Sequence, residues 1–130
     1  NKMQEYIQAN QISSRIKLLF RVKDEERNWL LSNAALFATP SLFEGFGRTP
    51  VEAAICKIPV ISTKETSLFE ATQGLCNYVE NATDEKELAE LILNIIENPE
   101  SENKLIKIAQ ELEERYKKEN CGKLYLNLFL

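Results

Sequence analysis

Histidine is absent from the 130 residues of this sequence. It is the side chain that most often serves as a general base in enzymes, and it is the commonest protein ligand of transition metals. Ser-His-Asp catalysis, Cys-His catalysis and histidine-based metal centres are therefore excluded within this chain. We expect neither a metal ion nor another cofactor.

Cysteine is scarce, and its spacing fits no known framework. Cys56, Cys76 and Cys121 are odd in number, lie far apart and form no Cys-x-x-Cys pair. Such spacing is typical of reduced, structurally packed thiols rather than of disulfides or a zinc site.

Long apolar runs and an excess of positive charge are also lacking. No stretch approaches the roughly 18 to 20 apolar residues that span a bilayer, and the first residues show no signal-peptide pattern. The formal net charge is −4, from 16 basic and 20 acidic residues, which argues against binding to nucleic acid. We expect a cytoplasmic protein.

The residues that remain predict one α/β domain over residues 1–130. Hydrophobic residues make up 44% of the chain, enough for a single modest core, and no repeat or linker divides it. Strand and helix patterns alternate along the chain. Strands are expected at Ile16–Val22, Ala34–Thr39, Ile58–Ser62 and Leu75–Val79, and helices at Lys2–Ala9, Asp24–Ser32, Thr49–Cys56, Thr66–Thr72, from Asp84 to Pro99, and Ser101–Lys118.

This alternation predicts a Rossmann-like parallel sheet with helices on both faces. Four strands are fewer than a complete Rossmann-like half carries, so we expect a fragment of a longer protein that lacks the first elements of its domain. Ligands of such sheets bind beyond the carboxyl ends of the strands. The loop that follows Thr39 is therefore the expected site.

Residues 40–54 pass from the end of an apolar run through a glycine-containing loop into a helix start. Gly45 and Gly47 flank Phe46 and permit a left-handed backbone or a close ligand approach. Thr49, Pro50 and Glu52 have the spacing of a capping box with proline at the first helical position. The free N–H groups of such a helix start favour phosphate oxygens.

Two carboxylates border the same stretch. Glu44 precedes the glycines and Glu52 lies in the first turn of the expected helix, with seven residues between them. Carboxylates repel phosphate but accept hydrogen bonds from hydroxyl groups. A ligand with phosphate at its centre and hydroxyl-rich rings at both ends, such as a nucleotide-diphosphate sugar, fits this pattern.

The motifs resemble a known enzyme family. Pro40-Ser-Leu-Phe-Glu-Gly-Phe-Gly, Pro50-Val-Glu-Ala-Ala and Ile58-Pro-Val-Ile-Ser62 are similar, in order, to the core of the retaining glycosyltransferases of family 4. Glu44 and Glu52 resemble their Glu-x7-Glu signature. The resemblance implies the C-terminal, donor-binding domain of the two-domain GT-B fold, with the acceptor domain missing and the isolated fragment inactive.

The resemblance also implies roles for the site residues. Glu44 would contact the donor sugar and stabilise positive charge at its anomeric carbon, as the catalytic residue. Glu52 would accept hydrogen bonds from the ribose, and its alternative role is the capping box alone. The backbone of Phe46 and Gly47 would lie against the sugar and phosphates, whereas the Phe46 ring is either a core plug or part of the site.

The remaining donor-binding candidates are Gly45, Arg48, Thr49 and Val51. Arg48 either pairs with the diphosphate or points to solvent. Thr49 serves as N-cap, and it and Val51 would offer N–H groups to phosphate. At Arg21 the family commonly has glycine near the nucleobase, so the identity of the base is left open, and the family's basic pair for the leaving diphosphate has no counterpart before Leu18.

The implied reaction transfers a sugar from a UDP-sugar, such as UDP-N-acetylhexosamine, with retention of configuration. The implied acceptor is a saccharide or an undecaprenyl-diphosphate-linked saccharide bound by the missing domain. Usage rich in Lys, Ile and Asn indicates an AT-rich bacterial gene. Because many bacterial enzymes of this family extend lipid-linked O-antigen or capsule units, the resemblance implies such a pathway at the inner face of the membrane, with membrane contact only in the full-length protein. The alternatives are a GT-B-shaped nucleotide-sugar epimerase and a non-catalytic nucleotide-sugar binding module.

Overall fold

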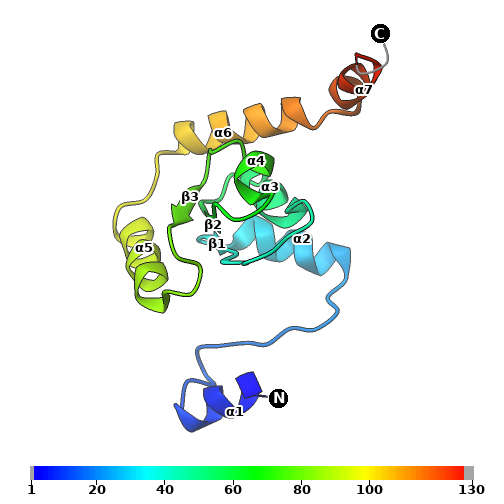
Figure 1. Cartoon of the computed structure of the whole chain (residues 1–130). Coiled ribbons are helices and arrows are strands. Elements are labelled where there is room, and N and C mark those ends of the chain that lie inside the picture. Colours follow the sequence, from blue (N-terminus) through cyan, green and yellow to red (C-terminus); the bar gives the residue numbers. More distant parts are fainter. Residues whose placement is uncertain (1, 128–130) are drawn as a thin grey trace.

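The computed structural model describes residues 2–127, without the side chains of Leu124 and Tyr125. Its three strands form one parallel sheet in the order β1-β2-β3 (Figure 1). The elements are α1 (Lys2–Ala9), α2 (Asp24–Asn33), β1 (Phe37–Ala38), α3 (Arg48–Ile55), β2 (Val60–Thr63), α4 (Leu68–Ala71), β3 (Asn77–Val79), α5 (Glu85–Glu97), α6 (Glu102–Arg115) and α7 (Lys118–Leu126).

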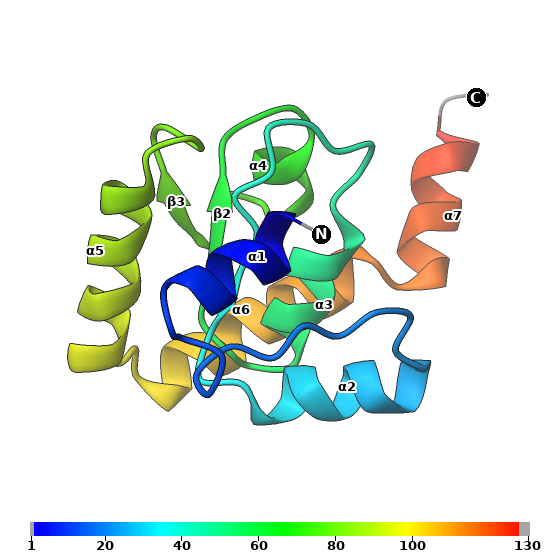
Figure 2. The ribbon, with the colours of Figure 1, turned by 90° about the horizontal axis from the view of Figure 1, so that it is seen from below.

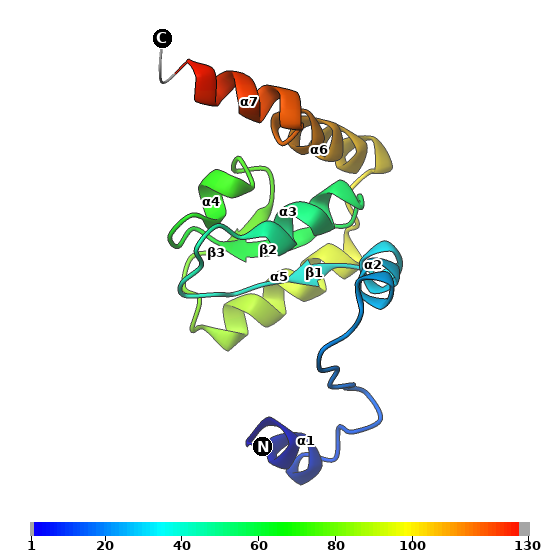
Figure 3. The same cartoon turned by 90° about the vertical axis from the view of Figure 1, so that its right-hand side faces the viewer.

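The central strand β2 lies between two layers of helices, and its four residues are all buried. Val60 packs into one apolar cluster with residues of α2, α3, α4 and α6. Ile61 points to the opposite face and packs with β3 and α5, as the alternation of side chains along a strand requires. Helices therefore cover both faces of the sheet, as predicted, with α3 and α4 on one side and α5 on the other (Figure 3).

The parallel register places the site loop at one edge of the sheet. Phe37 is paired with Val60, and Ile61 with Asn77. The carboxyl ends of β1 and β2 therefore lie side by side, and the segments that follow them, 39–47 and 64–67, leave the sheet from the same edge. This is the edge at which the sequence predicted the site.

The predicted strand Ile16–Val22 is not formed, so the sheet has three strands and not four. Residues 12–23 contain no helix or strand, and Leu19 and Phe20 are exposed. Arg21 has φ +54°, a left-handed conformation that interrupts an extended chain. A strand is stable only when it is paired, and the neighbouring β1 is only two residues long. Helix α1 stands apart from the α/β body at the far end of this stretch (Figures 1 and 3).

Side chains cap the starts of α5 and α6. Asp84 caps α5, since its Oδ1 accepts hydrogen bonds from the N–H groups of Lys86 at 2.9 Å and Glu87 at 3.1 Å. The Glu87 carboxylate accepts instead from the N–H groups of Glu80 and Asn81, and so fixes the turn after β3. Ser101 caps α6, which ends at Arg115 rather than at the predicted Lys118.

The expected packing of the thiols is confirmed only in part. All three cysteines are free, and each is half-buried rather than fully buried. None of the helices in the described part of the chain is long and apolar enough to cross a membrane.

The pH dependence of stability gives a test of the packing around Cys76. Burial raises the pKa of the Cys76 thiol from 9.0 to about 11. The unfolded chain therefore loses this proton first as the pH rises. We expect stability from this group to be complete below pH 9 and to be lost between pH 9 and 11, by on the order of 2 kcal/mol.

Urea denaturation at pH 8 to 11 under reducing conditions measures this change. Burial also raises the pKa of the Tyr78 hydroxyl, so wild type must be compared with Cys76→Ala, which keeps Tyr78. The variant should lose less stability over this range. Equal losses in both proteins would contradict the assignment to Cys76.

Candidate functional site

The loop between β1 and α3 is tied to the neighbouring β2–α4 connection by hydroxyl groups. The Thr63 hydroxyl donates to the Ser41 carbonyl at 2.9 Å, and the Ser67 hydroxyl donates to the Glu44 carbonyl at 3.2 Å. The Glu44 N–H donates to Thr66 Oγ1, also at 3.2 Å. Both backbone polar groups of Glu44 are thus satisfied by side chains more than twenty residues away, which fixes the loop without a ligand.

The Glu44 side chain is half-buried at this position. Its Oε1 accepts a hydrogen bond from the Ser41 hydroxyl at 3.3 Å, and Ser41 Oγ lies 3.3 Å from Thr39 Oγ1. A carboxylate accepts about four hydrogen bonds, so Glu44 retains acceptor capacity toward a ligand. The side chain is oriented but not saturated.

Gly47 turns the loop into α3 in a way that only glycine allows. Its φ is +86°, and a Cβ on this residue would lie 2.6 Å from Leu68 Cδ2. Leu68 is completely buried and has little freedom to move. Gly45, by contrast, has open space around the position of a Cβ.

Helix α3 begins one residue earlier than predicted, which makes the predicted capping box wrong. Gly47 occupies the N-cap position, and no side chain caps the helix. Thr49 is therefore the second helical residue, and Pro50 the third. The first four N–H groups of an α-helix have no acceptor within the helix. In α3 only Gly47, Arg48 and Thr49 supply such groups, because Pro50 has no N–H.

Arg48 and Thr49 are exposed at this helix start, whereas Val51 is not. The Val51 side chain is 5% exposed and belongs to the core cluster beneath α3. Any contact between Val51 and a ligand would have to involve its main chain. The first two helical residues are the accessible ones.

The Phe46 ring packs against Tyr116 at the end of α6. The ring centroids are 5.7 Å apart and the planes are nearly perpendicular, a geometry that aromatic pairs favour. Phe46 is nevertheless 47% exposed. The ring is therefore not a core plug.

Glu52 contacts two arginines rather than the backbone. Arg48 Nη2 lies 3.2 Å from its Oε1, and Arg27 Nη2, from α2, lies 3.7 Å from its Oε2. The partners of the Glu52 carboxylate thus come from α2 and α3, while the Glu44 carboxylate bonds to Ser41 in the loop after β1. The two carboxylates flank the glycine loop with separate sets of partners.

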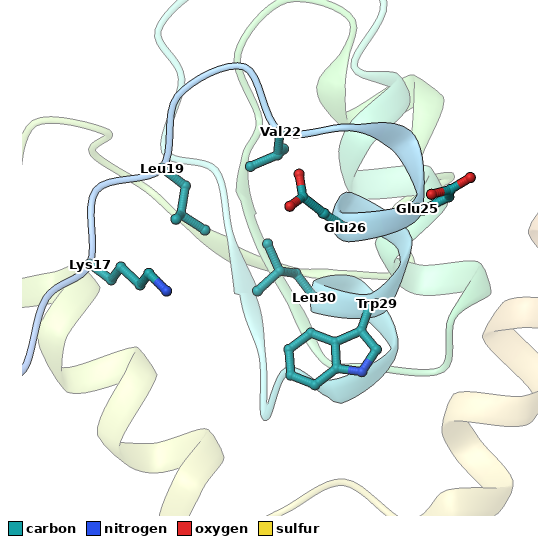
Figure 4. A pocket seen from close by; sticks show the side chains of 7 residues that line it. All are labelled: Lys17, Leu19, Val22, Glu25, Glu26, Trp29 and Leu30. Atoms are coloured by element: carbon teal, nitrogen blue, oxygen red, sulfur yellow. The ribbon is translucent and has the colours of Figure 1, made fainter.

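A separate hollow of about 400 Å³ lies between α2 and the segment that precedes it. Figure 4 shows Leu19, Val22 and Leu30 turned toward a common space beside Trp29. This hollow is mostly apolar and contains none of the predicted donor-binding residues. Among the described residues, no cluster of cysteine, aspartate and glutamate has a geometry that would hold a metal ion.

Comparison with known proteins identifies the family. The model of the family "Glycosyl transferases group 1" matches residues 1–112. The chain belongs to the group 1 glycosyl transferases. This match confirms the predicted family 4 and the predicted C-terminal domain of the GT-B fold.

Curated relatives of this glycosyl transferase domain have different names. It is 28% identical over 114 residues to O-antigen chain mannosyltransferase B of Escherichia coli, covering 88% of this chain and 30% of that protein. It is 33% identical over 120 residues to a probable sucrose-phosphate synthase of Thermosipho melanesiensis, covering 86% of this chain and 27% of that protein. The domain thus spans less than a third of the length of these relatives.

A solved structure confirms the fold of the glycosyl transferase domain. Sucrose-phosphate synthase from Thermosynechococcus elongatus superimposes with a TM-score of 0.80 at 24% sequence identity. The match covers 98% of this chain and 34% of that protein. The α/β architecture with a parallel sheet is therefore the one predicted.

Several residues that hold the site together were not predicted from the sequence. Arg27, Thr66 and Ser67 reach the loop or its carboxylates only through the tertiary fold. The run from Thr66 to Thr72 predicted helical turns, but nothing in it predicted hydrogen bonds to Glu44. Arg27 lies on the expected helix Asp24–Ser32, whose pattern predicted no contact with the site.

Alanine at the two loop glycines tests the turn into α3. Gly47→Ala should destabilise the domain by about 2 to 4 kcal/mol, because a Cβ meets Leu68 and the left-handed φ disfavours alanine. Gly45→Ala should change stability by less than about 0.5 kcal/mol. Chemical denaturation measures both, and equal effects of the two substitutions would contradict the geometry.

Proposed function

We propose that this domain binds the donor in a retaining glycosyltransferase, which transfers a sugar from a nucleotide-diphosphate sugar to an acceptor hydroxyl. The observation that carries the proposal is the passage from the glycine loop into α3. There, uncapped N–H groups at a helix start lie between two carboxylates, Glu44 and Glu52. The longer enzyme would supply the acceptor-binding domain, and residues 1–130 would form one domain without acceptor chemistry of its own.

The start of α3 is proposed to bind the diphosphate. The N–H groups of Gly47, Arg48 and Thr49 and the positive end of the helix dipole all favour an anion there. The Arg48 side chain, which is 80% exposed, adds a mobile positive charge. Gly45 and Phe46 would lie against the phosphates and the sugar through their backbone, and Val51 only through its main chain.

Glu44 is proposed to be the catalytic residue. Its carboxylate would accept hydrogen bonds from the hydroxyls of the donor sugar and stabilise positive charge developing at the anomeric carbon. In the transfer, the bond from this carbon to the diphosphate oxygen breaks, and the acceptor oxygen bonds on the same face. The acceptor proton passes to the departing phosphate, so the step requires no histidine.

Glu52 is proposed to accept hydrogen bonds from the ribose hydroxyls. It is half-buried in the second turn of α3. There it is close enough to the helix start to contact a nucleoside whose phosphates lie at that start. A carboxylate that receives two hydroxyl donors discriminates strongly against ligands that lack them. Glu52 would thus select nucleotides over simple diphosphates.

The finer identity of the substrates is also proposed. The donor is a UDP-sugar such as UDP-N-acetylhexosamine, and the acceptor is a saccharide or an undecaprenyl-diphosphate-linked saccharide of O-antigen or capsule synthesis, at the inner face of a bacterial membrane. The name of the Escherichia coli relative supports the O-antigen pathway. That of the Thermosipho relative refers to a different product, so donors with different bases and sugars must be compared.

Titration of the domain with UDP, GDP, UDP-N-acetylglucosamine, UDP-glucose and GDP-mannose, followed by NMR, tests the proposal. We expect one nucleotide to shift the amide signals of Gly45, Gly47 and Thr49. Glu52→Ala should weaken nucleotide binding about tenfold, the effect of a lost charge-assisted hydrogen bond. Glu44→Ala should leave the affinity for the nucleotide unchanged but remove any gain that the sugar provides.

Glu90→Ala, which removes an exposed acid of α5, serves as the control and should bind as wild type does. In the longer enzyme, Glu44→Ala should mainly lower turnover. A folded domain that binds none of these ligands at millimolar concentration would overturn the proposed donor site.

A further inference from the structure

Arg27 connects α2 to the proposed ribose-binding carboxylate. Its Nη2 lies 3.7 Å from Glu52 Oε2, while Arg48 Nη2 lies 3.2 Å from Glu52 Oε1. Each carboxylate oxygen therefore faces a different arginine. Arg27 also has Asp24 as a weaker partner, with Nη1 3.8 Å from Oδ1, but Asp24 is 88% exposed.

The two arginines differ in how firmly they are held. Arg48 is 80% exposed and lies one turn before Glu52 on the same helix, and such surface pairs contribute only about 0.3 to 0.5 kcal/mol. Arg27 is 41% exposed and spans two helices. Its Nε is shielded from solvent and has no hydrogen-bond partner. Arg48 makes the shorter, hydrogen-bonded contact with Glu52, but it is the more exposed of the two arginines and can turn toward solvent.

The shape of the guanidinium group explains what the Arg27 Nε requires. The N–H of Nε and one N–H of Nη2 lie on the same edge of the planar group and point the same way. Nη2 already faces Glu52. A small movement of the carboxylate along this edge would give Nε its acceptor and convert the contact into a two-point pair, the strongest arrangement of arginine and carboxylate.

We propose that Arg27 is a positioning residue for donor binding, which holds the Glu52 carboxylate in the orientation that accepts the ribose hydroxyls. The inference rests on the proposed function of Glu52. Arg48 leaves Glu52 when the donor binds and pairs with the diphosphate, while Arg27 stays. Because a carboxylate has about four acceptor positions, Glu52 holds Arg27 and two hydroxyls at once.

Charge gives a second reason for Arg27 to stay. A donor brings negative phosphates close to the start of α3, where Glu52 is also negative. Two like charges about 4 Å apart repel each other by several kcal/mol when they are partly shielded from water. Once Arg48 has turned to the phosphates, Arg27 is the cation that remains beside Glu52 among its partners described here.

The test compares ribonucleotides with deoxyribonucleotides, because only the contact to the ribose depends on Glu52. Dissociation constants are measured by calorimetry for UDP, GDP and their 2′-deoxy and 3′-deoxy forms. Wild type should prefer the ribonucleotide by about fivefold or more. Arg27→Leu should weaken ribonucleotide binding about five- to tenfold and reduce this preference to below about twofold, since the deoxy forms lose little.

Two further variants separate positioning from a general effect on folding. Arg27→Lys keeps the charge but not the two-point geometry and should recover only part of the preference. Glu52→Gln should lose the preference by itself, and adding Arg27→Leu to it should cause no further loss, because the two residues act through one contact. Arg15→Leu, at an exposed position away from the loop, should behave as wild type.

The outcomes distinguish this inference from the proposed function. If wild type binds no nucleotide, the proposed donor site fails, and the inference fails with it. If wild type binds and prefers ribonucleotides, but folded Arg27→Leu or Arg27→Lys keeps the full preference, only the role of Arg27 is wrong. Losses that simply add in the double variant would likewise overturn it.

Discussion

The left-handed conformation of Gly47 is the constraint on which the site depends. This residue ends the loop after β1 and starts α3 in one step, with φ +86° and no side chain to cap the helix. Contact with the buried Leu68 fixes the position of the turn. The first N–H groups of α3 therefore remain free, with Glu44 just before them and Glu52 just after. A side chain at position 47 would disturb all three features together.

Hydroxyl groups give the loop its order before any ligand is present. Thr63 ends β2, Thr66 and Ser67 follow it, and all three bond to the backbone of residues 41–44. Thr66 does so with φ +49°, which a β-branched residue adopts only under strain from its surroundings. Because the loop is already ordered, binding loses little conformational entropy there. The parallel register of β1 and β2 is what brings these hydroxyls within reach.

Local patterns predicted those parts of the fold and site that depend on neighbouring residues. The alternation of strands and helices, the helix that starts at Asp84, and the glycine loop at the carboxyl end of β1 were all predicted from short stretches. The strand at Ile16–Val22 was wrong because a strand depends on a partner that its own residues do not specify. The cap at Thr49 was wrong because Gly47, two residues before Thr49, starts the helix by its backbone alone. Arg27 belongs to a third kind of feature, contacts between helices that are distant in sequence, which no local pattern encodes.

The aromatic contact between Phe46 and Tyr116 joins the glycine loop to the junction of α6 and α7. Tyr116 is anchored on its other side, where its hydroxyl donates to the Ala71 carbonyl at 2.7 Å. Helix α7 projects from this junction away from the sheet (Figures 1 and 2). Tyr116 therefore connects α4 to the glycine loop through a single side chain. Removing its ring would leave Phe46 without this packing partner beside the glycines.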